Sequence, residues 1–294
     1  MMVYLNGEFL PIDEAKISPF DRGFLFGDGA YELIPVYARQ AFRLDEHLAR
    51  LENSLHALRL PNPHSREAWR SLIQSVIAQH EAEDQSVYLQ ITRGADALFK
   101  RDHAFPAQSK PTVFAFSSAL ITPSATQRAQ GVAAITATDT RWLRCDLKTT
   151  SLLANVLLRQ DAVEQHCAET ILLRDGLLTE GAASTILLVK NGVLLAPPKD
   201  QRVLPGVTYD VVLELAAQHA MPYQVRDIQA AELETADELW MCSSTREILP
   251  ITRLDGQAVG SGKPGIWAEQ MYSWYALFRD GVMRKPVPTQ RREV

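Results

Sequence analysis

The sequence lacks the features that mark several classes of protein. Its 294 residues include only three cysteines, Cys145, Cys167 and Cys242, and these share no close spacing. An odd number of scattered cysteines argues against a disulfide framework and against a zinc cluster, and it suits a reducing compartment. No apolar run reaches the length of about 18 residues that a membrane-spanning helix needs.

An excess of one charge is lacking too, because 30 basic and 35 acidic residues leave a net charge of only −5. We therefore expect neither a general nucleic-acid binder nor a membrane-surface binder. Neither a Walker-type GxxxxGK[ST] sequence nor GxGxxG is present, so no nucleotide-phosphate loop is indicated. The N-terminus has no basic region before its apolar stretch, which predicts a cytoplasmic protein without a targeting segment.

The composition that is present, with 46% apolar and 22% charged residues, is that of an ordinary globular protein. A chain of this length favours two domains. Strand and helix patterns alternate in two blocks, and a stretch of few charges that contains Pro123 separates them. We predict an N-terminal domain of residues 1–118, a linker at 119–126 and a C-terminal domain of residues 127–294. Mixed patterns in both blocks indicate α/β or α+β domains, with a ligand cleft between them.

Turn and cap signals divide these blocks into elements. Asn6-Gly7 predicts a tight hairpin turn, and Asp45 is expected to cap a helix whose apolar stripe runs from Leu48 to Leu58. Further strands are predicted at 30–37, 41–44, 87–92, 112–117, 132–136, 170–173, 184–189 and 193–196, and further helices at 65–81, 152–166, 208–219 and 264–278.

Two residues are notable for their setting. Lys148 precedes an apolar helix pattern, and a lysine held in a partly apolar site becomes a nucleophilic amine, because desolvation disfavours the ammonium form. Glu180 is predicted to lie between two strands, before Gly181 and further small residues that let the backbone approach a flat ligand. Its carboxylate could pair with a ring nitrogen of that ligand. Taken alone, a solvated lysine and a solvent-facing glutamate are the ordinary interpretations.

Two other segments are candidates for an anion site. Gly206, Val207 and Thr208 stand at a predicted helix start, where free N–H groups and the helix dipole suit a phosphate. Ser243 and Ser244 follow a buried strand pattern, where α/β sheets usually place binding loops. A threonine N-cap and a serine-rich loop are also ordinary features of any protein.

A basic segment of the first block contains Arg93, Arg101 and His103. Arginine offers a planar fork to a carboxylate and histidine adds a donor, so this segment could bind an acidic group. A solvated basic loop is the alternative. Asp21 and Asp28 lack nearby His or Glu ligands, and we expect no metal site there.

Seven motifs, taken in order, resemble those of one enzyme family. They are FDRGFLFGDGAYE, EHLARLENSL, TRG followed by RDHAF, RWLRCDLKTTSLLANVL, LLTEGAAS, LPGVTYDVV and DELWMCSSTREILP. Together they resemble the D-amino acid aminotransferases among the fold-type-IV pyridoxal-phosphate enzymes, over nearly the whole chain. The resemblance implies a smaller N-terminal α/β domain and a larger C-terminal pseudo-barrel domain.

The resemblance also implies roles for individual residues. Lys148 matches the catalytic lysine that holds pyridoxal phosphate as a Schiff base, and Glu180 matches the glutamate that pairs with the pyridine nitrogen. The positions that match other cofactor contacts are Arg50, Val207, Thr208, Ser243 and Ser244 around the phosphate and Leu204 against the ring. The positions that match the trap for the substrate α-carboxylate are Tyr31, Arg101 and His103, of which Arg101 and His103 come from the other subunit of a homodimer.

The chain departs from the family pattern in two places. The segment before Arg101 is longer than usual by a few residues, which affects how far this loop reaches. Ala182 and Ala183 replace the serines that are common after Thr-Glu-Gly, and Thr185 replaces an asparagine. A hydrogen bond to the phosphate or to the carboxylate is therefore expected to be missing.

The activity implied by the resemblance is transamination of D-amino acids, with a 2-oxo acid such as 2-oxoglutarate as acceptor. Two alternatives share the fold: a branched-chain L-amino acid aminotransferase and a 4-amino-4-deoxychorismate lyase, which would use the same lysine to expel pyruvate. Arg101-Asp-His103 favours the D-specific group. A non-catalytic pyridoxal-phosphate-binding protein is a third alternative, and the presence of both Lys148 and Glu180 argues against it.

Overall fold

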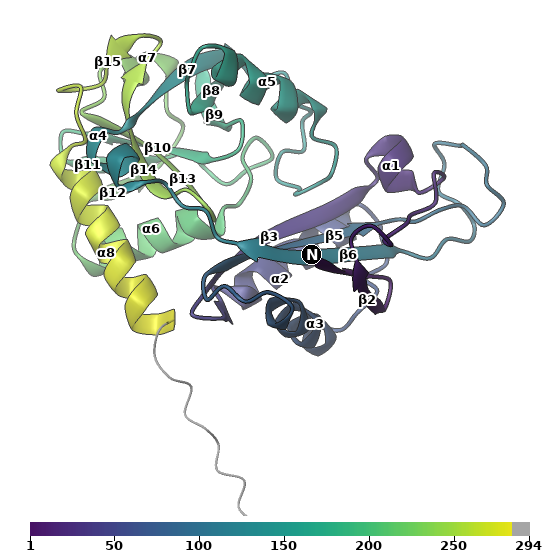
Figure 1. The fold of residues 1–294 in the computed structure, drawn as a ribbon. Coiled ribbons are helices and arrows are strands. Elements are labelled where there is room, and N and C mark those ends of the chain that lie inside the picture. The colour runs from purple at the N-terminus through teal and green to yellow at the C-terminus, as the bar shows by residue number, and fades with distance from the viewer. Residues whose placement is uncertain (284–294) are drawn as a thin grey trace, which may run out of the picture.

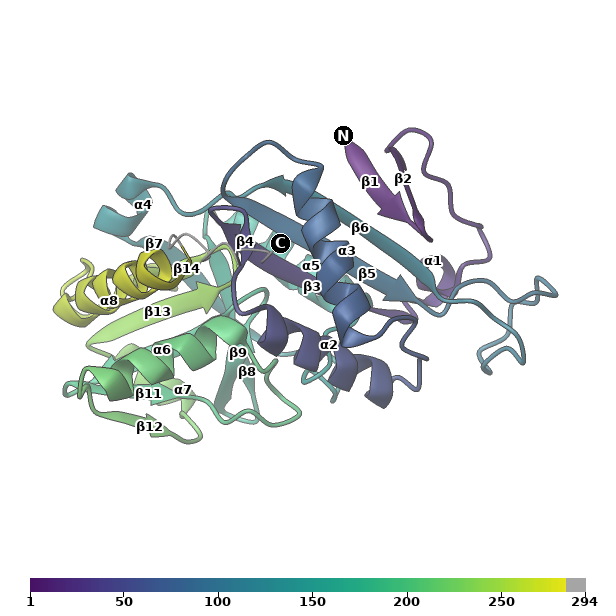
Figure 2. The same cartoon turned by 90° about the horizontal axis from the view of Figure 1, so that it is seen from below.

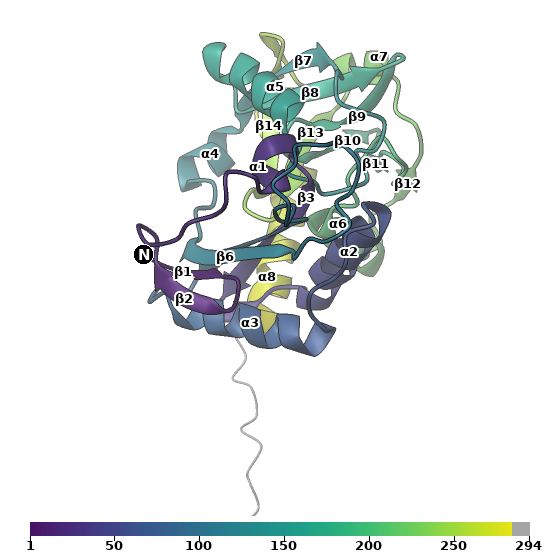
Figure 3. The ribbon, with the colours of Figure 1, turned by 90° about the vertical axis from the view of Figure 1, so that its right-hand side faces the viewer.

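The computed structural model describes residues 1–283, so the last 11 residues of the predicted C-terminal domain lie outside the described part. Two β-sheets form the molecule (Figure 1), and the segment that follows β6 leads from one to the other. Figure 3 shows the sheets one above the other, with α3 below the first and α5 above the second. The helices are α1 (Arg22–Phe26), α2 (Leu44–Ala57), α3 (Arg66–Ala78), α4 (Ala125–Gln130), α5 (Leu153–Glu164), α6 (Val207–Gln218), α7 (Ala230–Glu234) and α8 (Ile266–Met283).

The first sheet has six strands in the order β2-β1-β6-β5-β3-β4. Helices α2 and α3 cross the same face of this sheet (Figure 2), and the predicted stripe of α2 is buried there as far as Leu55. The hairpin predicted at Asn6-Gly7 is confirmed, since both residues have the positive φ that its tight turn requires. The strands are β1 (Met2–Leu5), β2 (Glu8–Pro11), β3 (Gly29–Tyr37), β4 (Gln40–Ala41), β5 (Gln85–Thr92) and β6 (Thr112–Ala119).

The start of α2 differs from the prediction. Arg43 adopts a left-handed conformation, with φ 51°, and the helix begins at Leu44, so Asp45 is not its cap. Strand β4 ends at Ala41, earlier than expected, because Phe42 turns into the core of the other half of the molecule. Asp45 instead forms an ion pair with Arg70 on α3.

The second sheet has nine strands and curls into a half-barrel. Its central strands are buried on both faces, as in β10 and β13, where continuous apolar sequence replaces alternation. The path β12-β11-β10-β13-β14-β7-β8-β9 mixes parallel and antiparallel pairs, and β15 pairs with β14. The strands are β7 (Val132–Thr138), β8 (Glu169–Arg174), β9 (Leu177–Gly181), β10 (Thr185–Lys190), β11 (Val193–Ala196), β12 (Tyr223–Val225), β13 (Glu238–Ser243), β14 (Glu247–Leu254) and β15 (Gln257–Ala258).

Two segments expected to be irregular have regular structure. Glu180 does not lie between strands but within β9, which pairs with β8 through a turn at Asp175-Gly176, where both residues have positive φ. In the stretch predicted as the linker, β6 continues to Ala119, and α4 begins after a capping box formed by Ser124. The division into two domains with a linker at 119–126 stays a prediction.

Candidate active site

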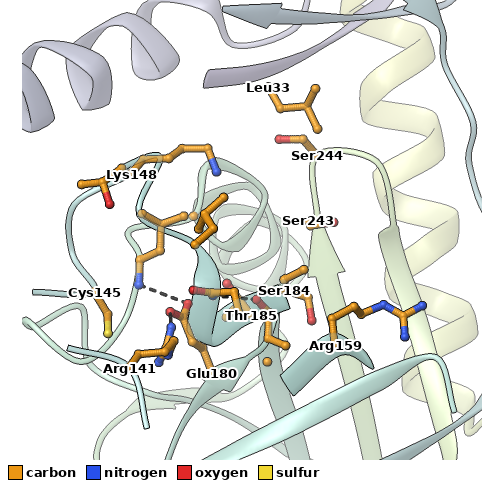
Figure 4. Close-up of a pocket in the computed structure, with 18 of the residues that line it drawn as sticks. Leu33, Arg141, Cys145, Lys148, Arg159, Glu180, Ser184, Thr185, Ser243 and Ser244 are labelled. Atoms are coloured by element: carbon orange, nitrogen blue, oxygen red, sulfur yellow. Dashed lines mark hydrogen bonds and ion pairs between the residues drawn. The ribbon is translucent and has the colours of Figure 1, made fainter. Parts of the chain in front are cut away.

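A cavity of about 730 Å³ lies between strand β3 and helix α2 on one side and the second sheet on the other. Most of the residues selected from the sequence line this cavity, although they are scattered over more than 200 positions of the chain. They are Tyr31, Arg50, Lys148, Glu180, Leu204, Val207, Thr208, Ser243 and Ser244. Figure 4 shows the cavity with Lys148, Glu180, Ser243 and Ser244 around it.

Lys148 is attached to strand β3 rather than standing at a helix start. Its carbonyl accepts a hydrogen bond from Tyr31 N at 3.1 Å, and its own N–H donates to Ser54 Oγ at 3.2 Å. Helix α5 begins only at Leu153. The side chain crosses toward the first sheet, and Nζ lies 4.1 Å from the centroid of the Tyr31 ring. An amine in this position faces the cavity.

Glu180 has a buried carboxylate held by two groups. Arg141 donates to Oε1, and the backbone N–H of Leu204 donates to Oε2 at 3.1 Å. Burial raises the pKa of the Glu180 carboxyl, while the nearby Arg141 guanidinium opposes this rise. Arg141 is itself fixed by Asp139, with Nη2 2.7 Å from Oδ2. Sequence reasoning gave Arg141 no role, although it opens the motif that contains Lys148.

Arg50 reaches the cavity from α2 and is bound on two sides. Its Nε and Nη2 donate to Glu32 at 2.8 and 2.7 Å, and its Nη1 donates to the carbonyl of Pro205 at 3.0 Å. Burial opposes ionisation of Glu32, but the charge and hydrogen bonds of Arg50 outweigh it and lower the Glu32 pKa to about 2. His47 Nδ1 contacts the same carboxylate at 2.8 Å. Arg50 thereby links Glu32 on strand β3 to Pro205, in the segment that leads into α6.

The beginning of α6 provides backbone donors at the cavity. Its N-cap is Gly206, which brings no side chain to cap the first N–H groups, and Val207 and Thr208 follow in the first turn. A Cβ at Gly206 would lie 3.1 Å from Thr185 Oγ1, so a larger residue would crowd this end. Ser243 and Ser244 approach from the turn between β13 and β14. Such uncapped N–H groups and hydroxyls suit a bound anion.

The remaining two predicted residues are not at this cavity. Arg101 and His103 are exposed in the connection between β5 and β6, which extends beyond the end of the first sheet (Figures 1 and 2). Both side chains lie near Phe26, with ring centroids 5.2 Å apart for His103. Arg22 anchors the loop by donating to the carbonyls of Asp102 and His103 at 2.6 and 3.1 Å. The cavity of one chain therefore receives neither side chain from its own loop.

Comparison with known proteins places this site in a family. The family model described as "Amino-transferase class IV" matches residues 29–254, which contain every residue of the cavity. The chain belongs to the class IV aminotransferases. The sequence of this class IV aminotransferase is 38% identical to a D-alanine aminotransferase of Bacillus licheniformis, over 90% of the chain and 92% of that protein. It is 35% identical to one from Listeria monocytogenes, over 94% of the chain and 95% of the relative.

Solved structures give the same fold for this class IV aminotransferase. A branched-chain amino acid aminotransferase of Escherichia coli superimposes with a TM-score of 0.87 at 25% identity, covering 94% of each chain. A branched-chain aminotransferase of the archaeon Thermoproteus uzoniensis, solved with norvaline, gives a TM-score of 0.83 at 24% identity, covering 96% of this chain and 95% of that one. The fold-type-IV architecture expected from the sequence is confirmed.

The residues of the cavity fit pyridoxal phosphate, the cofactor of this class. An amine that can bind the aldehyde carbon, a buried carboxylate that can face a ring nitrogen and an uncapped helix start for a phosphate all border one space. Within residues 1–283, no cluster of three or more metal-ligating side chains occurs, and no helix is long and apolar enough to span a membrane.

Proposed function

We propose that this chain transfers the amino group of D-amino acids to a 2-oxo acid such as 2-oxoglutarate, with pyridoxal phosphate bound at Lys148. The supporting observation is that Lys148 and Glu180 border one cavity, beside an anion-binding helix start. Relatives named D-alanine aminotransferase, at 35–38% identity over most of the chain, support the choice of D-amino acids. The three scattered cysteines, which suit a reducing compartment, support a cytoplasmic location.

Each cavity residue has a defined task in this proposal. Bound pyridoxal phosphate supplies an electron sink for the charge that develops when the substrate Cα–H bond breaks. The Lys148 amine would hold the cofactor and, as a free amine, would move the proton from the substrate Cα as a general base. Glu180 would hold a proton at the ring nitrogen, and the Arg141 guanidinium favours the ionised form of Glu180 against the effect of burial.

The residues on the two sides of the cavity, the β3 and α2 wall and the wall formed by the second sheet, bind and orient the cofactor and the substrate. Val207, Thr208, Ser243 and Ser244 donate to the phosphate, and Arg50 holds this anion site by its contact with Pro205. Leu204, which lines the cavity, would pack against the ring. Tyr31 stands beside the Lys148 amine, where a substrate carboxylate can reach its hydroxyl.

We propose that Arg101 and His103 complete the carboxylate trap in the cavity of a second copy of this chain. Neither side chain borders its own cavity, and both are exposed on a loop anchored by Arg22. Trp142 and Val156, which line the cavity, are exposed, so the apolar surface next to its mouth is open to a partner. A homodimer with the site at the subunit interface satisfies both observations.

Hybrid dimers test this exchange of loops. The Lys148→Ala chain should be nearly inactive and the Arg101→Ala chain should have a raised KM for D-alanine, but a mixed dimer of the two contains one site with an intact lysine and an intact partner loop. We expect coexpression of differently tagged chains and purification of the hybrid to restore about half of the parental activity per dimer, since one of two sites is whole. If hybrid dimers are no more active than dimers of either single variant, the loop contributes to the cavity of its own chain.

A panel of amino donors tests the activity. With 2-oxoglutarate as acceptor, D-alanine should react and L-alanine should not; with pyruvate as acceptor, D-glutamate should react and L-glutamate should not. Faster reaction of L-leucine or L-valine would favour the branched-chain alternative. Release of pyruvate from 4-amino-4-deoxychorismate without any acceptor would favour the lyase.

A further inference from the structure

Glu247 is a fully buried carboxylate that three side chains contact. It accepts hydrogen bonds from Tyr37 Oη at 3.1 Å, from Arg279 Nη1 at 2.8 Å and from Arg128 Nη2 at 2.5 Å. Burial raises the pKa of Tyr37, so its hydroxyl stays a donor over the working pH range. The activity proposed above assigns no task to any of these four residues.

The three donors come from three separate parts of the chain. Tyr37 ends strand β3, which carries Tyr31 and Leu33 at the cavity. Arg128 lies on α4, in the segment between the two sheets, and also donates to the carbonyl of residue 248 at 3.2 Å. Arg279 lies on α8, and its guanidinium carbon is 5.3 Å from the centroid of the Tyr37 ring. One carboxylate thus joins both sheets and the segment between them.

The position of Glu247 in its own strand connects this cluster to the anion site. Glu247 begins β14 and pairs with Ser243, the last residue of β13. Between them lies the turn that contains Ser244 and Thr245, which line the cavity. Glu247 has φ 53°, a left-handed conformation that residues other than glycine rarely adopt. Its side-chain contacts therefore hold the base of the turn in a shape that the backbone alone disfavours.

We propose that Glu247 is a positioning residue that fixes the serine turn, residues 243–246, relative to strand β3. Through Tyr37 it sets the spacing between the wall that holds the phosphate and the wall that carries Tyr31. This inference rests on the proposed use of Ser243 and Ser244 as phosphate donors. It predicts that removing the Glu247 charge lowers cofactor affinity, and not merely stability.

The test compares Glu247→Gln with a matched control, Glu238→Gln. Glu238 is also buried and also accepts three hydrogen bonds, from Trp240 Nε1 at 2.9 Å and from the backbone N–H groups of Trp267 and Ala268 at 3.0 and 2.8 Å. It stands at the opposite end of β13 and does not line the cavity. Both substitutions remove a buried charge from the same half of the molecule, but only one adjoins the serine turn.

The readouts are the Kd of pyridoxal phosphate for the cofactor-free protein, the inhibition constant of inorganic phosphate in that titration, and Tm. Glu247→Gln should weaken both affinities by about tenfold, the factor that corresponds to one lost charge-assisted hydrogen bond. Glu238→Gln should lower Tm and leave both affinities within about twofold of the parent. Equal affinities for Glu247→Gln and the parent, or equal losses in both variants, would overturn the proposal.

Tyr37→Phe provides a milder second variant if Glu247→Gln does not fold. This substitution removes only the hydrogen bond between Tyr37 on β3 and Glu247, while the contacts of Glu247 with Arg128 and Arg279 remain. The wall that carries Tyr31 is therefore loosened and the serine turn is not. The KM for D-alanine should rise several-fold, and the Kd of pyridoxal phosphate should change little. An unchanged KM would overturn the role of Tyr37 in spacing the walls. Failure of the D-amino acid proposal is distinguishable, because the affinities for cofactor and phosphate do not depend on the handedness of the substrate.

Discussion

The side-chain nitrogen of Lys148 lies 4.1 Å from the centroid of the Tyr31 ring, and Tyr31 N donates to the carbonyl of Lys148 at 3.1 Å. Thr149 extends this contact through a bridge to Ala30. The Lys148 amine is therefore positioned by strand β3 of the first sheet, although its loop follows β7 of the second sheet. This arrangement leads to predictions for each wall of the cavity.

Lys148→Ala should retain pyridoxal phosphate through the anion site but lose its covalent attachment, and turnover should be negligible because the base is removed. Borohydride treatment followed by peptide mapping should place the cofactor of the parent on Lys148 and leave the variant unlabelled. A labelled peptide that does not contain Lys148 would refute this assignment.

Glu180→Gln should lower kcat while cofactor retention stays nearly unchanged, because a neutral amide cannot hold the charge of a protonated ring nitrogen. Steady-state kinetics and the absorbance of bound cofactor measure the two effects separately. Glu238→Gln controls for the loss of a buried carboxylate elsewhere. If Glu180→Gln were as active as the parent, Glu180 would have no part in the mechanism.

The pair of Glu32 and Arg50 should make stability depend on acid pH. The Glu32 pKa falls from 4.5 to about 2 in the folded protein, so the pair stabilises fully above about pH 4.5 and loses this contribution as pH falls toward 2. The contribution is on the order of 3 kcal/mol. Urea denaturation at several pH values should show the parent and Glu32→Gln converging as pH drops from 7 to 3. A constant difference between them would contradict the role of this ion pair.

Arg101→Ala should raise the KM for D-alanine, because a charge-assisted hydrogen bond to the carboxylate is worth about 1.5–3 kcal/mol. Lys100→Ala removes an exposed cation from the same loop and should leave KM unchanged. His103→Ala should cost less than Arg101→Ala. If Arg101→Ala and Lys100→Ala behave alike, Arg101 does not bind the carboxylate, and the longer loop has displaced it.

Local patterns in the sequence predicted much of this molecule. The Asn6-Gly7 hairpin, helix α3 after Ser65, and the start of α6 after Gly206 follow from residue types within a few positions. In each case the same local chemistry that favours the element also determines its ends. The order of the seven motifs indicated the family, and that resemblance named the nine residues that line the cavity. No local pattern could have predicted that these nine residues lie together.

Other features depend on contacts between distant residues and escaped prediction. Arg141 reaches Glu180 across 39 positions, and the place of Lys148 follows from β3 rather than from the helix after it. The left-handed residue Arg43, which replaces Asp45 at the start of α2, reflects the packing of Phe42 in the other half of the molecule. Such tertiary contacts override local propensity.

The stereochemical claim is tested most directly by exchange of the substrate Cα hydrogen. Cofactor-loaded protein is incubated in D2O with D-alanine or L-alanine and without an acceptor, and loss of the Cα proton is followed by NMR. Because the carboxylate trap and Lys148 present one face of the bound substrate, D-alanine should exchange at least about 100-fold faster than L-alanine, a difference of about 2.7 kcal/mol in barrier. Faster exchange of L-alanine would contradict the assignment of this chain to D-amino acids.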